Sequence, residues 1–367
     1  MRDVGIDRRA LLRRVGGIAA GVATTSLTAC ETGADRDSTG TKGAKGSKTL
    51  VVRDAGGTYG AANRKAVYDP FTKETGIRIK VVNPLYEEML AQIKKGRPRF
   101  DVMDTNMADL ARFHQEDAIE ELDYDRLKHA KDAGIAESLL TSYGLGKNYW
   151  ASVMAYRTDA FGGKKPETWA DFWDTKAFRG SRALQGSVDF PELEFALLAD
   201  GVPLHKLYPL DVDRAFKALD EIKGSVRTFW EDGAVPGELL DRKEVVASRV
   251  WNGRLQDLIQ RGAPLAYQWN GARRQSNGYG IPKGAENPDA AYRLIDFALR
   301  PEVQANTAKI YPQGPVVPIA YTNLSENDAT NLASTPGHLA SSFDLDVEWW
   351  LKNKDTVTKR WRKWMRA

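Results

Sequence analysis

Short apolar runs alternate with amphipathic stretches over the first part of the chain beyond residue 48. Residues 49–53, 77–82 and 100–104 are rich in β-branched and apolar side chains, which predicts three strands. One helix is predicted from about Ala61 to the residue before Gly76, and a second over residues 86–95. The order strand, helix, strand, helix, strand predicts an α/β lobe with a mainly parallel sheet.

Two loops follow predicted strands in this lobe. In α/β sheets ligands bind beyond the carboxyl ends of strands, so loop 56–60, with Tyr59, and loop 105–107, with Asn106, are candidate ligand contacts. The glycine-rich loop 56–60 either brings backbone N–H groups to a ligand or is an ordinary turn into a helix. It matches neither the phosphate-binding loop nor the dinucleotide fingerprint.

The pattern changes after a predicted buried strand at 149–157. Aromatic-rich helices and loops follow, with further strands expected at 244–251 and 265–269 and a helix at 288–299. Near the end of the chain, Trp361, Trp364 and Met365 have the spacing of one apolar helical face within a basic segment. We expect this terminal helix to pack on the second lobe with its basic face in water, or else to touch anionic lipid or a membrane protein.

The N-terminus has the layout of an export signal. An arginine pair, Arg8 and Arg9, precedes a short apolar run and the sequence LTAC, which ends at Cys30. This layout resembles a bacterial lipoprotein signal of the twin-arginine class. We therefore predict an export signal at 1–29, lipid attachment at Cys30 and a flexible tether over 30–48, against the alternative of a buried N-terminal helix.

Charge and motifs narrow the function classes. The chain has a net charge of +4, and residues 1–29 carry five arginines against two aspartates, so the exported part is near +1. Nucleic-acid binding needs a concentrated excess of basic residues, so this near-neutral net charge argues against it. The four histidines are scattered, and neither a nucleophile elbow nor a cysteine other than Cys30 is present. We expect no metal, no cofactor and no covalent chemistry, although a carboxylate-based hydrolase leaves no sequence signature.

The chain from about residue 50 to 321 resembles the extracellular solute-binding proteins of ABC transporters, particularly the spermidine/putrescine-binding type. The resemblance rests on the order and spacing of RKAVYDPFTKETGI (64–77), FDVM (100–103), KPETWADFWD (165–174), ALLADG (196–201), WNGR (251–254), IPKGAENPDAA (281–291) and RPE (300–302). It implies a type II periplasmic-binding-protein-like fold: two α/β lobes, joined by crossing strands, with a ligand cleft between them. The implied first lobe is 49–150 plus 267–312, and the second is 151–266 plus 313–367.

The resemblance also implies site residues. Polyamine binders hold a polycation between aromatic faces, with carboxylates at its ends. Trp251 matches a strand-end tryptophan of the family, and Tyr59 its first aromatic position in a loop; core packing is the alternative for each. Glu192 lies near the second-lobe carboxylate, with Asp189 and Glu194 as neighbouring candidates.

The segment 273–279 departs from the family pattern. Polyamine binders commonly have an aromatic residue and then an aspartate here, where this chain has Gln275 and Asn277, followed by Tyr279. An asparagine both donates and accepts, so a zwitterionic ligand fits as well as a dication. Arg273 and Arg274 are expected to be solvated loop residues; if either turned into the cleft, a carboxylate-bearing ligand would be favoured.

Together these features predict a lipid-anchored receptor that delivers a small polar solute to an ABC permease outside the cytoplasmic membrane. The predicted ligand contacts are Tyr59, Asn106, Glu192, Trp251, Asn277 and Tyr279. A polyamine is the expected solute, with an amino acid or small carboxylate as the alternative. A surface hydrolase or a sensory lipoprotein is the competing class. We expect a monomer that binds no nucleic acid.

Overall fold

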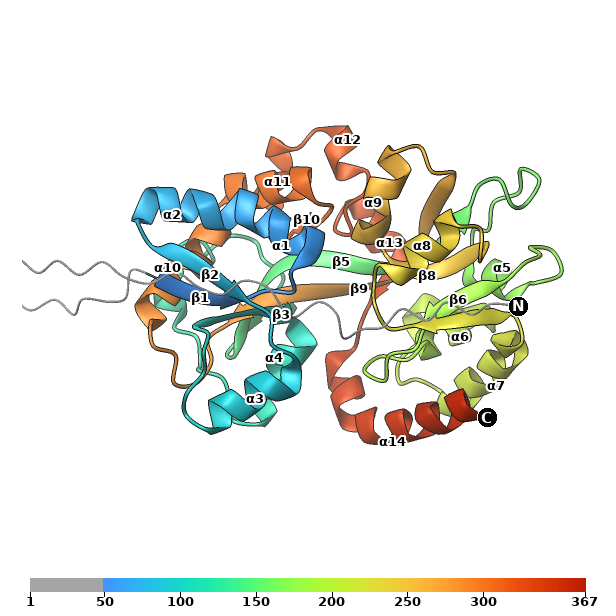
Figure 1. Ribbon diagram of the computed structural model, residues 1–367, viewed down its shortest axis with the longest axis horizontal. Coiled ribbons are helices and arrows are strands. Elements are labelled where there is room, and N and C mark those ends of the chain that lie inside the picture. Colours follow the sequence, from blue (N-terminus) through green and yellow to red (C-terminus); the bar gives the residue numbers. More distant parts are fainter. Residues whose placement is uncertain (1–48) are drawn as a thin grey trace, which may run out of the picture. The chain divides into compact units, whose positions relative to one another are not determined.

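One sheet of eleven strands runs through residues 49–367, the part of the chain that this computed structural model describes (Figure 1). Its main path is β2-β1-β3-β9-β5-β8-β6-β7, while β4 and β10 pair with β5 and β11 pairs with β9. The predicted export signal, Cys30 and the tether lie outside the described residues. Among residues 49–367, no helix has the length and apolar character needed to cross a membrane.

The first strands and helices follow the predicted alternation. Strands β1 (Thr49–Arg53), β2 (Arg78–Val82) and β3 (Val102–Asn106) are parallel to one another. The helices that follow these strands are α1 (Gly57–Asn63), the π-helix η1 (Arg64–Tyr68) and α2 (Asp69–Thr75) after β1, α3 (Tyr86–Lys94) after β2, and α4 (Met107–Gln115) after β3. Gly76 ends α2 in the left-handed conformation, with φ 73°, as predicted for its position.

The first helix begins earlier than its sequence pattern predicts. Gly56 and Gly57 have φ of 70° and 60°, so the chain turns sharply after β1 and becomes helical at Gly57. Tyr59 therefore lies in the first turn of α1, and the prediction that it stands in a loop is wrong. The helical start fixes the direction of the Tyr59 side chain.

Two long strands form the middle of the sheet. β5 (Gly144–Arg157) and β9 (Leu265–Gly280) are antiparallel partners. β9 also pairs with β3, and β5 also pairs with β8. The two long strands therefore connect both halves of the sheet. β9 extends eleven residues beyond the predicted strand 265–269. Arg273 and Arg274, expected to be loop residues, lie in this strand, and each is paired with an acid from a distant part of the chain, Glu194 and Asp344 respectively.

The second half of the sheet is again parallel. Strands β6 (Arg182–Gln185), β7 (Val226–Trp230) and β8 (Ala247–Trp251) run in one direction. Around them lie α5 (Trp169–Trp173), α6 (Leu193–Ala199), α7 (Val212–Lys223), α8 (Val235–Asp241) and α9 (Asn252–Gln260).

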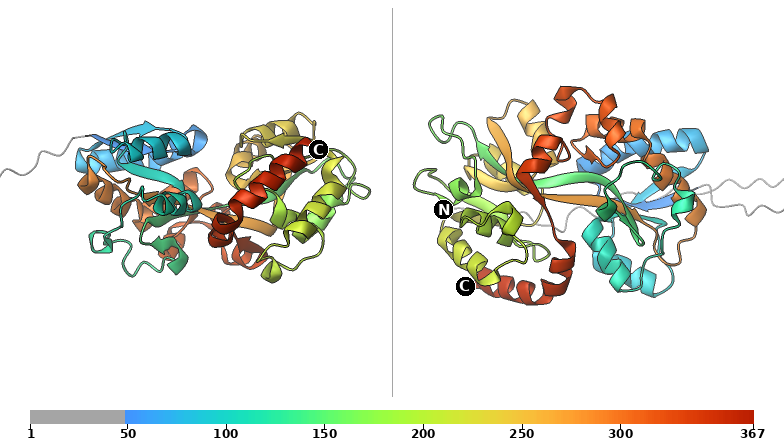
Figure 2. Two further views of the ribbon diagram at one scale, coloured as in Figure 1. Left: turned by 90° about the horizontal axis from the view of Figure 1, so that it is seen from below. Right: turned by 180° about the vertical axis from the view of Figure 1, so that it is seen from behind.

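After β9 the chain first returns to the elements near its beginning. Helices α10 (Pro288–Ala298) and α11 (Pro301–Ile310) lie beside the first strands and helices in Figure 1. The remaining strands and α-helices are β4 (Leu140–Thr141), β10 (Gly314–Pro315), α12 (Glu326–Ala329), α13 (Pro336–Ser341), β11 (Ser342–Asp344) and α14 (Val347–Arg366). Four short 3-10 helices complete the described part of the chain: η2 (Tyr124–Arg126), η3 (Glu137–Leu139), η4 (Leu204–Lys206) and η5 (Pro318–Asn323). The long α14 ends on the same side as α7 (Figures 1 and 2).

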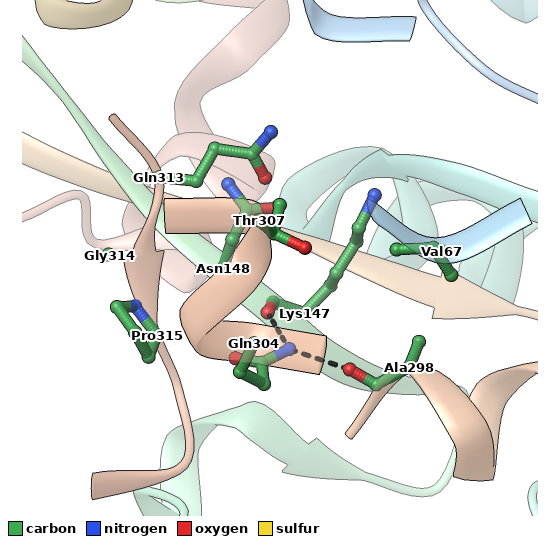
Figure 3. A pocket seen from close by; sticks show the side chains of 9 residues that line it. All are labelled: Val67, Lys147, Asn148, Ala298, Gln304, Thr307, Gln313, Gly314 and Pro315. Atoms are coloured by element: carbon green, nitrogen blue, oxygen red, sulfur yellow. Dashed lines mark hydrogen bonds between the residues drawn. The ribbon is translucent and has the colours of Figure 1, made fainter. Parts of the chain in front are cut away.

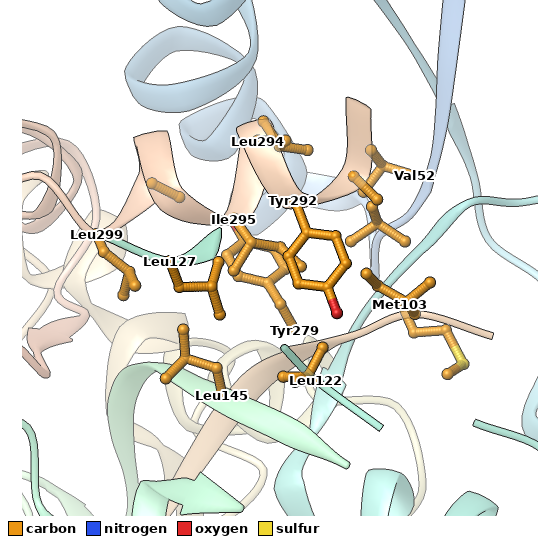
Figure 4. Packing of buried hydrophobic residues seen from close by; sticks show 14 of the residues in the cluster. Val52, Met103, Leu122, Leu127, Leu145, Tyr279, Tyr292, Leu294, Ile295 and Leu299 are labelled. Carbon is orange, nitrogen blue, oxygen red and sulfur yellow. The ribbon is translucent and has the colours of Figure 1, made fainter. Parts of the chain in front are cut away.

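The buried apolar side chains form separate cores. The first cluster combines residues between 50 and 145 with residues between 279 and 317, and Figure 4 shows part of it around Tyr279 and Tyr292. Two further clusters contain most of the apolar residues between 151 and 272, and one of them includes the tryptophans of α14. We call the part around the first cluster the first lobe and the part around the other two the second lobe. The residue boundaries predicted for the lobes remain a prediction.

Candidate functional site

Three tryptophan side chains from β5, β7 and β8 meet edge to face. The ring of Trp251, the last residue of β8, lies 5.9 Å from the ring of Trp150 and 5.6 Å from that of Trp230. We call these three residues the indole cluster. The Nε1 atoms of Trp230 and Trp251 are buried and have no hydrogen-bond partner among residues 49–367. Buried N–H groups normally have a partner, so both can serve a bound ligand.

A buried guanidinium lies beside the indole cluster. Arg249 is in β8, its Cζ lies 5.2 Å from the ring centroid of Trp230 and 6.0 Å from that of Trp251, and only Nη2 forms a hydrogen bond, to Ser152. Nε and Nη1 are buried without a partner in the described part of the chain. Burial lowers the pKa of Arg249 to about 9, so the group remains charged at neutral pH.

Glu192 supplies a carboxylate near this arginine. It is fully buried at the N-cap of α6, where its Oε1 accepts a hydrogen bond from the backbone N–H of Gln185 at 2.6 Å. Its Oε2 has no partner among residues 49–367. Burial raises the pKa of Glu192, and Arg249 is the strongest influence lowering it again. The role of Glu192 as a ligand contact remains a prediction.

A chain of hydrogen bonds links the indole cluster to the first lobe. Trp150 Nε1 donates to Asn277 Oδ1 at 3.0 Å, and Asn277 Nδ2 donates to the Tyr59 hydroxyl at 2.9 Å. The hydroxyl in turn donates to Asp104 Oδ1 at 2.7 Å. Tyr59, Asn277 and Trp251, three residues selected from sequence, therefore belong to one contiguous set of contacts.

Behind Tyr59 lies a buried group of charges that we call the acid–lysine cluster, formed by Asp54, Asp104 and Lys147. Lys147 Nζ donates to Asp104 Oδ2 at 2.5 Å and to the Tyr59 hydroxyl at 3.1 Å. Asn63 donates to both carboxylates, at 2.7 and 3.2 Å. Two carboxylates face one ammonium, and burial raises the pKa of Asp104. This side of the site therefore contains more acidic than basic side chains.

The comparisons with known proteins agree with this architecture. Residues 66–333 match the family described as bacterial extracellular solute-binding protein. The chain belongs to this family. A structure of an ABC transporter substrate-binding protein from Bradyrhizobium japonicum has a TM-score of 0.82 and 34% identity, covering 86% of this chain and 99% of that one. The match shows the periplasmic-binding-protein-like fold, with two α/β lobes and crossing strands.

Two relatives and one further structure have names that state a ligand. The gamma-aminobutyric acid-binding protein of Pseudomonas aeruginosa is 31% identical over 87% of this chain and 91% of its own length. The spermidine/putrescine-binding periplasmic protein of Escherichia coli is 26% identical over 66% and 71%. The solved Atu4243-GABA receptor has a TM-score of 0.78 and 30% identity, covering 86% and 97%. This solute-binding protein is thus the substrate-binding component of an ABC transporter and not an enzyme.

The remaining predicted contacts are Asn106, the register partner of Asn277 in the β3–β9 pair, and Tyr279, whose ring centroid lies 5.1 Å from Lys147 Nζ. The Asn106 side chain accepts a hydrogen bond from the backbone of Ala108 at 2.8 Å and caps α4. Tyr279 is fully buried in the first core, although its hydroxyl has no partner in the described part of the chain. Their roles as ligand contacts remain predictions, and the structure gives each of them a structural role as well.

The expectation that Arg273 and Arg274 are solvated loop residues is wrong. Arg273 is fully buried in β9, where its Nη1 donates to Glu194 Oε2 at 2.9 Å. Arg274 is also buried, and its guanidinium binds both carboxylate oxygens of Asp344, at 2.8 and 2.7 Å. Both arginines are therefore neutralised by acids from distant parts of the chain, which lets them occupy a central strand.

Arg249, Trp150 and Lys147 were not among the residues selected from sequence. Arg249 lies in β8 within a largely apolar stretch, and Lys147 and Trp150 lie in β5. A charged residue inside a predicted buried strand needs a buried partner or a ligand. That signal was available for Arg249 in the sequence EVVASRVW and would have identified it.

A small cavity in the first lobe borders the acid–lysine cluster through Lys147. It has a volume of about 10 Å³ and is lined by Lys147, Asn148, Gln304, Gln313 and neighbouring residues (Figure 3). The side-chain amides of Asn148 and Gln313 are buried there without partners among residues 49–367. Ligand pockets are usually of about 300 Å³ or more, and a cavity of this size suits a single water molecule.

Proposed function

We propose that this protein binds a small zwitterionic amino acid of the 4-aminobutanoate (GABA) type and delivers it to an ABC permease. The observation that carries the proposal is the buried Arg249, whose Nε and Nη1 lack partners among residues 49–367. A guanidinium matches the geometry of a carboxylate with two parallel N–H donors. The same buried charge would repel the end of a diamine.

The remaining groups of the site suit the rest of such a ligand. The Cζ of Arg254 lies 5.9 Å from the ring centroid of Trp251 and adds positive potential near the carboxylate end. An ammonium end is expected against the faces of Trp150 and Trp251, on the side of Tyr59 and Asn277, where the acid–lysine cluster contributes negative charge. The names of two of the similar proteins, which state GABA, support this choice.

Polyamine binding is the second candidate. It is supported by the spermidine/putrescine-binding relatives, by the indole cluster and by the unpaired Oε2 of Glu192. A dication would place its two ammonium groups near Glu192 and near the acid–lysine cluster, and would require Glu192 to outweigh the repulsion from Arg249.

Three four-carbon compounds distinguish these candidates by calorimetric titration of residues 31–367. GABA, putrescine and butyrate share a carbon chain and differ only in their charged ends. We expect GABA to bind at micromolar concentration or tighter, with putrescine and butyrate at least tenfold weaker. Putrescine binding more tightly than GABA would refute the proposal and favour the polyamine.

The matched variants are Arg249→Met and Arg249→Lys. We expect Arg249→Met to abolish GABA binding and Arg249→Lys to retain a weakened form, because lysine keeps the charge but loses the paired donors. Circular dichroism confirms folding of each variant. GABA affinity that is unchanged in a folded Arg249→Met variant would remove Arg249 from the site.

We also propose that Cys30 is lipid-modified after removal of residues 1–29 and that the protein remains at the outer face of the cytoplasmic membrane. The proposal rests on the arginine pair, the apolar run and the LTAC sequence that ends in the chain's single cysteine. A family that binds solutes outside the cell and passes them to a permease has a direct use for such an anchor.

A further inference from the structure

The apolar face of α14 packs against the second core. Trp350, Val357, Trp361 and Trp364 are buried in the second core. Three of the indoles also donate hydrogen bonds: Trp350 to Glu194 at 2.8 Å, Trp361 to the Gly186 carbonyl at 3.1 Å and Trp364 to Asp220 at 2.7 Å. These contacts fix the rotation of the helix about its axis. The opposite face is therefore presented to the exterior in one defined orientation.

That opposite face is strongly basic. Of the seven basic residues in α14, Lys354 and Arg360 form ion pairs with Asp189 and Asp213. The other five are exposed and have no acidic partner among residues 49–367: Lys352, Lys359, Arg362, Lys363 and Arg366. A shallow hollow on this face is lined by Thr356, Lys359, Arg360, Lys363 and Arg366. We call the five unpaired residues the basic face.

The charge of α14 contrasts with that of the rest of the domain. Residues 49–367 contain equal numbers of basic and acidic residues, whereas α14 has seven basic residues against two acidic ones. The described chain before α14 therefore has five more acidic than basic residues. A helix of this length presents its charges along roughly 30 Å, so the positive potential is concentrated in one elongated surface strip rather than spread over the molecule.

We infer that the basic face of α14 is a docking surface for an anionic phospholipid membrane. The five cations are long, flexible and exposed, and they form a strip instead of a closed pocket, which suits many mobile phosphate groups better than one small anion. Because the tryptophans are buried in the core, the helix rests on headgroups by charge and does not insert. The tether predicted over 30–48 would hold the domain within roughly 25 Å of the lipid, where weak attraction is effective.

The inference is tested with the unlipidated domain, residues 31–367, and sedimented vesicles. Residues 31–367 include every residue that the structure describes. Vesicles are made of equal parts phosphatidylglycerol and phosphatidylcholine, or of phosphatidylcholine alone. We expect binding only to the first kind, and its loss at high salt, because charges exposed to water are screened.

Two triple variants with the same change of net charge decide where binding occurs. Lys359→Gln/Lys363→Gln/Arg366→Gln removes three charges of the basic face, and we expect at least a tenfold loss of partition, since each cation near the surface contributes about fivefold. The control, Lys65→Gln/Lys73→Gln/Lys80→Gln, removes three exposed lysines from the region of η1, α2 and β2, far from α14 in Figure 1. We expect the control to bind nearly as well as the wild type.

Three outcomes would overturn the inference. Equal loss in both variants would mean that net charge alone drives binding. Absence of binding by the wild-type domain at low salt would remove the membrane as partner. Unchanged vesicle binding in the α14 variant, with reduced transport in cells, would assign the basic face to a protein partner instead. None of these outcomes depends on which solute the protein binds.

Discussion

Replacing Lys147 with methionine tests the acid–lysine cluster most directly. The Lys147 and Asp104 side chains are 2% and 0% exposed, and their Nζ and Oδ2 atoms lie 2.5 Å apart. Methionine keeps the length and apolar stem of lysine but leaves Asp104 buried without its cation. Breaking a buried ion pair by removing one partner costs about 3–5 kcal/mol. That is a large part of a typical total stability of about 5–15 kcal/mol.

The pH dependence gives a second, independent magnitude. Without Lys147, Asp104 avoids the cost of a buried, unpaired negative charge by binding a proton in the folded state. The folded pKa of Asp104, already raised by burial, then moves further above the unfolded value of about 3.9. Protonating Asp104, relative to an aspartate in the unfolded chain, costs about 4 kcal/mol at pH 7 and about 1.5 kcal/mol at pH 5. The folded state holds the extra proton, so the variant is most stable at low pH and loses stability as pH rises.

The assay is urea unfolding of wild type and Lys147→Met at pH 5 and pH 7, followed by circular dichroism. The matched control is Lys94→Met, because Lys94 and Glu116 form a pair of similar length, 2.6 Å, with side chains 54% and 45% exposed. We expect a loss of less than about 1 kcal/mol for this control. The double variant Lys147→Met/Asp104→Asn should recover most of the loss at pH 7.

Two results would refute this reasoning. A Lys147→Met variant no less stable than Lys94→Met would show that the buried charges do not depend on one another. A double variant as unstable as the single variant would show that lost packing, rather than the unpaired carboxylate, causes the effect.

Three other changes have defined outcomes. Trp251→Ala should weaken ligand binding at least tenfold in titration while circular dichroism shows a folded domain, and unchanged affinity would place Trp251 outside the site. Arg273→Met should lower the free energy of unfolding by about 3–5 kcal/mol because Glu194 is left buried without its cation; a loss below about 1 kcal/mol in urea unfolding would contradict this. Cys30→Ser should release the protein from membranes in cell fractionation, and continued retention would argue against the lipid anchor.

The alternation of strands and helices in the first lobe was predictable because it depends on local patterns. Strand β1 has the predicted bounds, and α2 ends at the glycine that its sequence indicates. The site was predictable only in part. Trp251 and Glu192 were selected through the resemblance to a family; they lie at the end of β8 and at the N-cap of α6, and their contact with a ligand remains a prediction.

The failures concern charges whose partners are distant in sequence. The run from Arg273 to Asn277 has the polarity of a loop, yet it forms a central strand because Glu194 and Asp344 neutralise its arginines. Lys147 is likewise 43 residues from Asp104. Local composition cannot reveal such pairs, because each partner alone has the appearance of a solvated residue. Each charged side chain can be buried only because its partner, distant in sequence, is buried or placed beside it.

The composition of the first core has a consequence for how the chain acquires its structure during synthesis. That core combines residues between 50 and 145 with residues between 279 and 317. A ribosome must therefore translate most of the chain before the first lobe can complete its core. The core of the second lobe cannot be complete until the tryptophans of α14 have been translated. Contacts of such wide sequence separation slow folding. Truncated chains that end before about residue 317 should remain incomplete in both halves and depend on chaperones or be degraded.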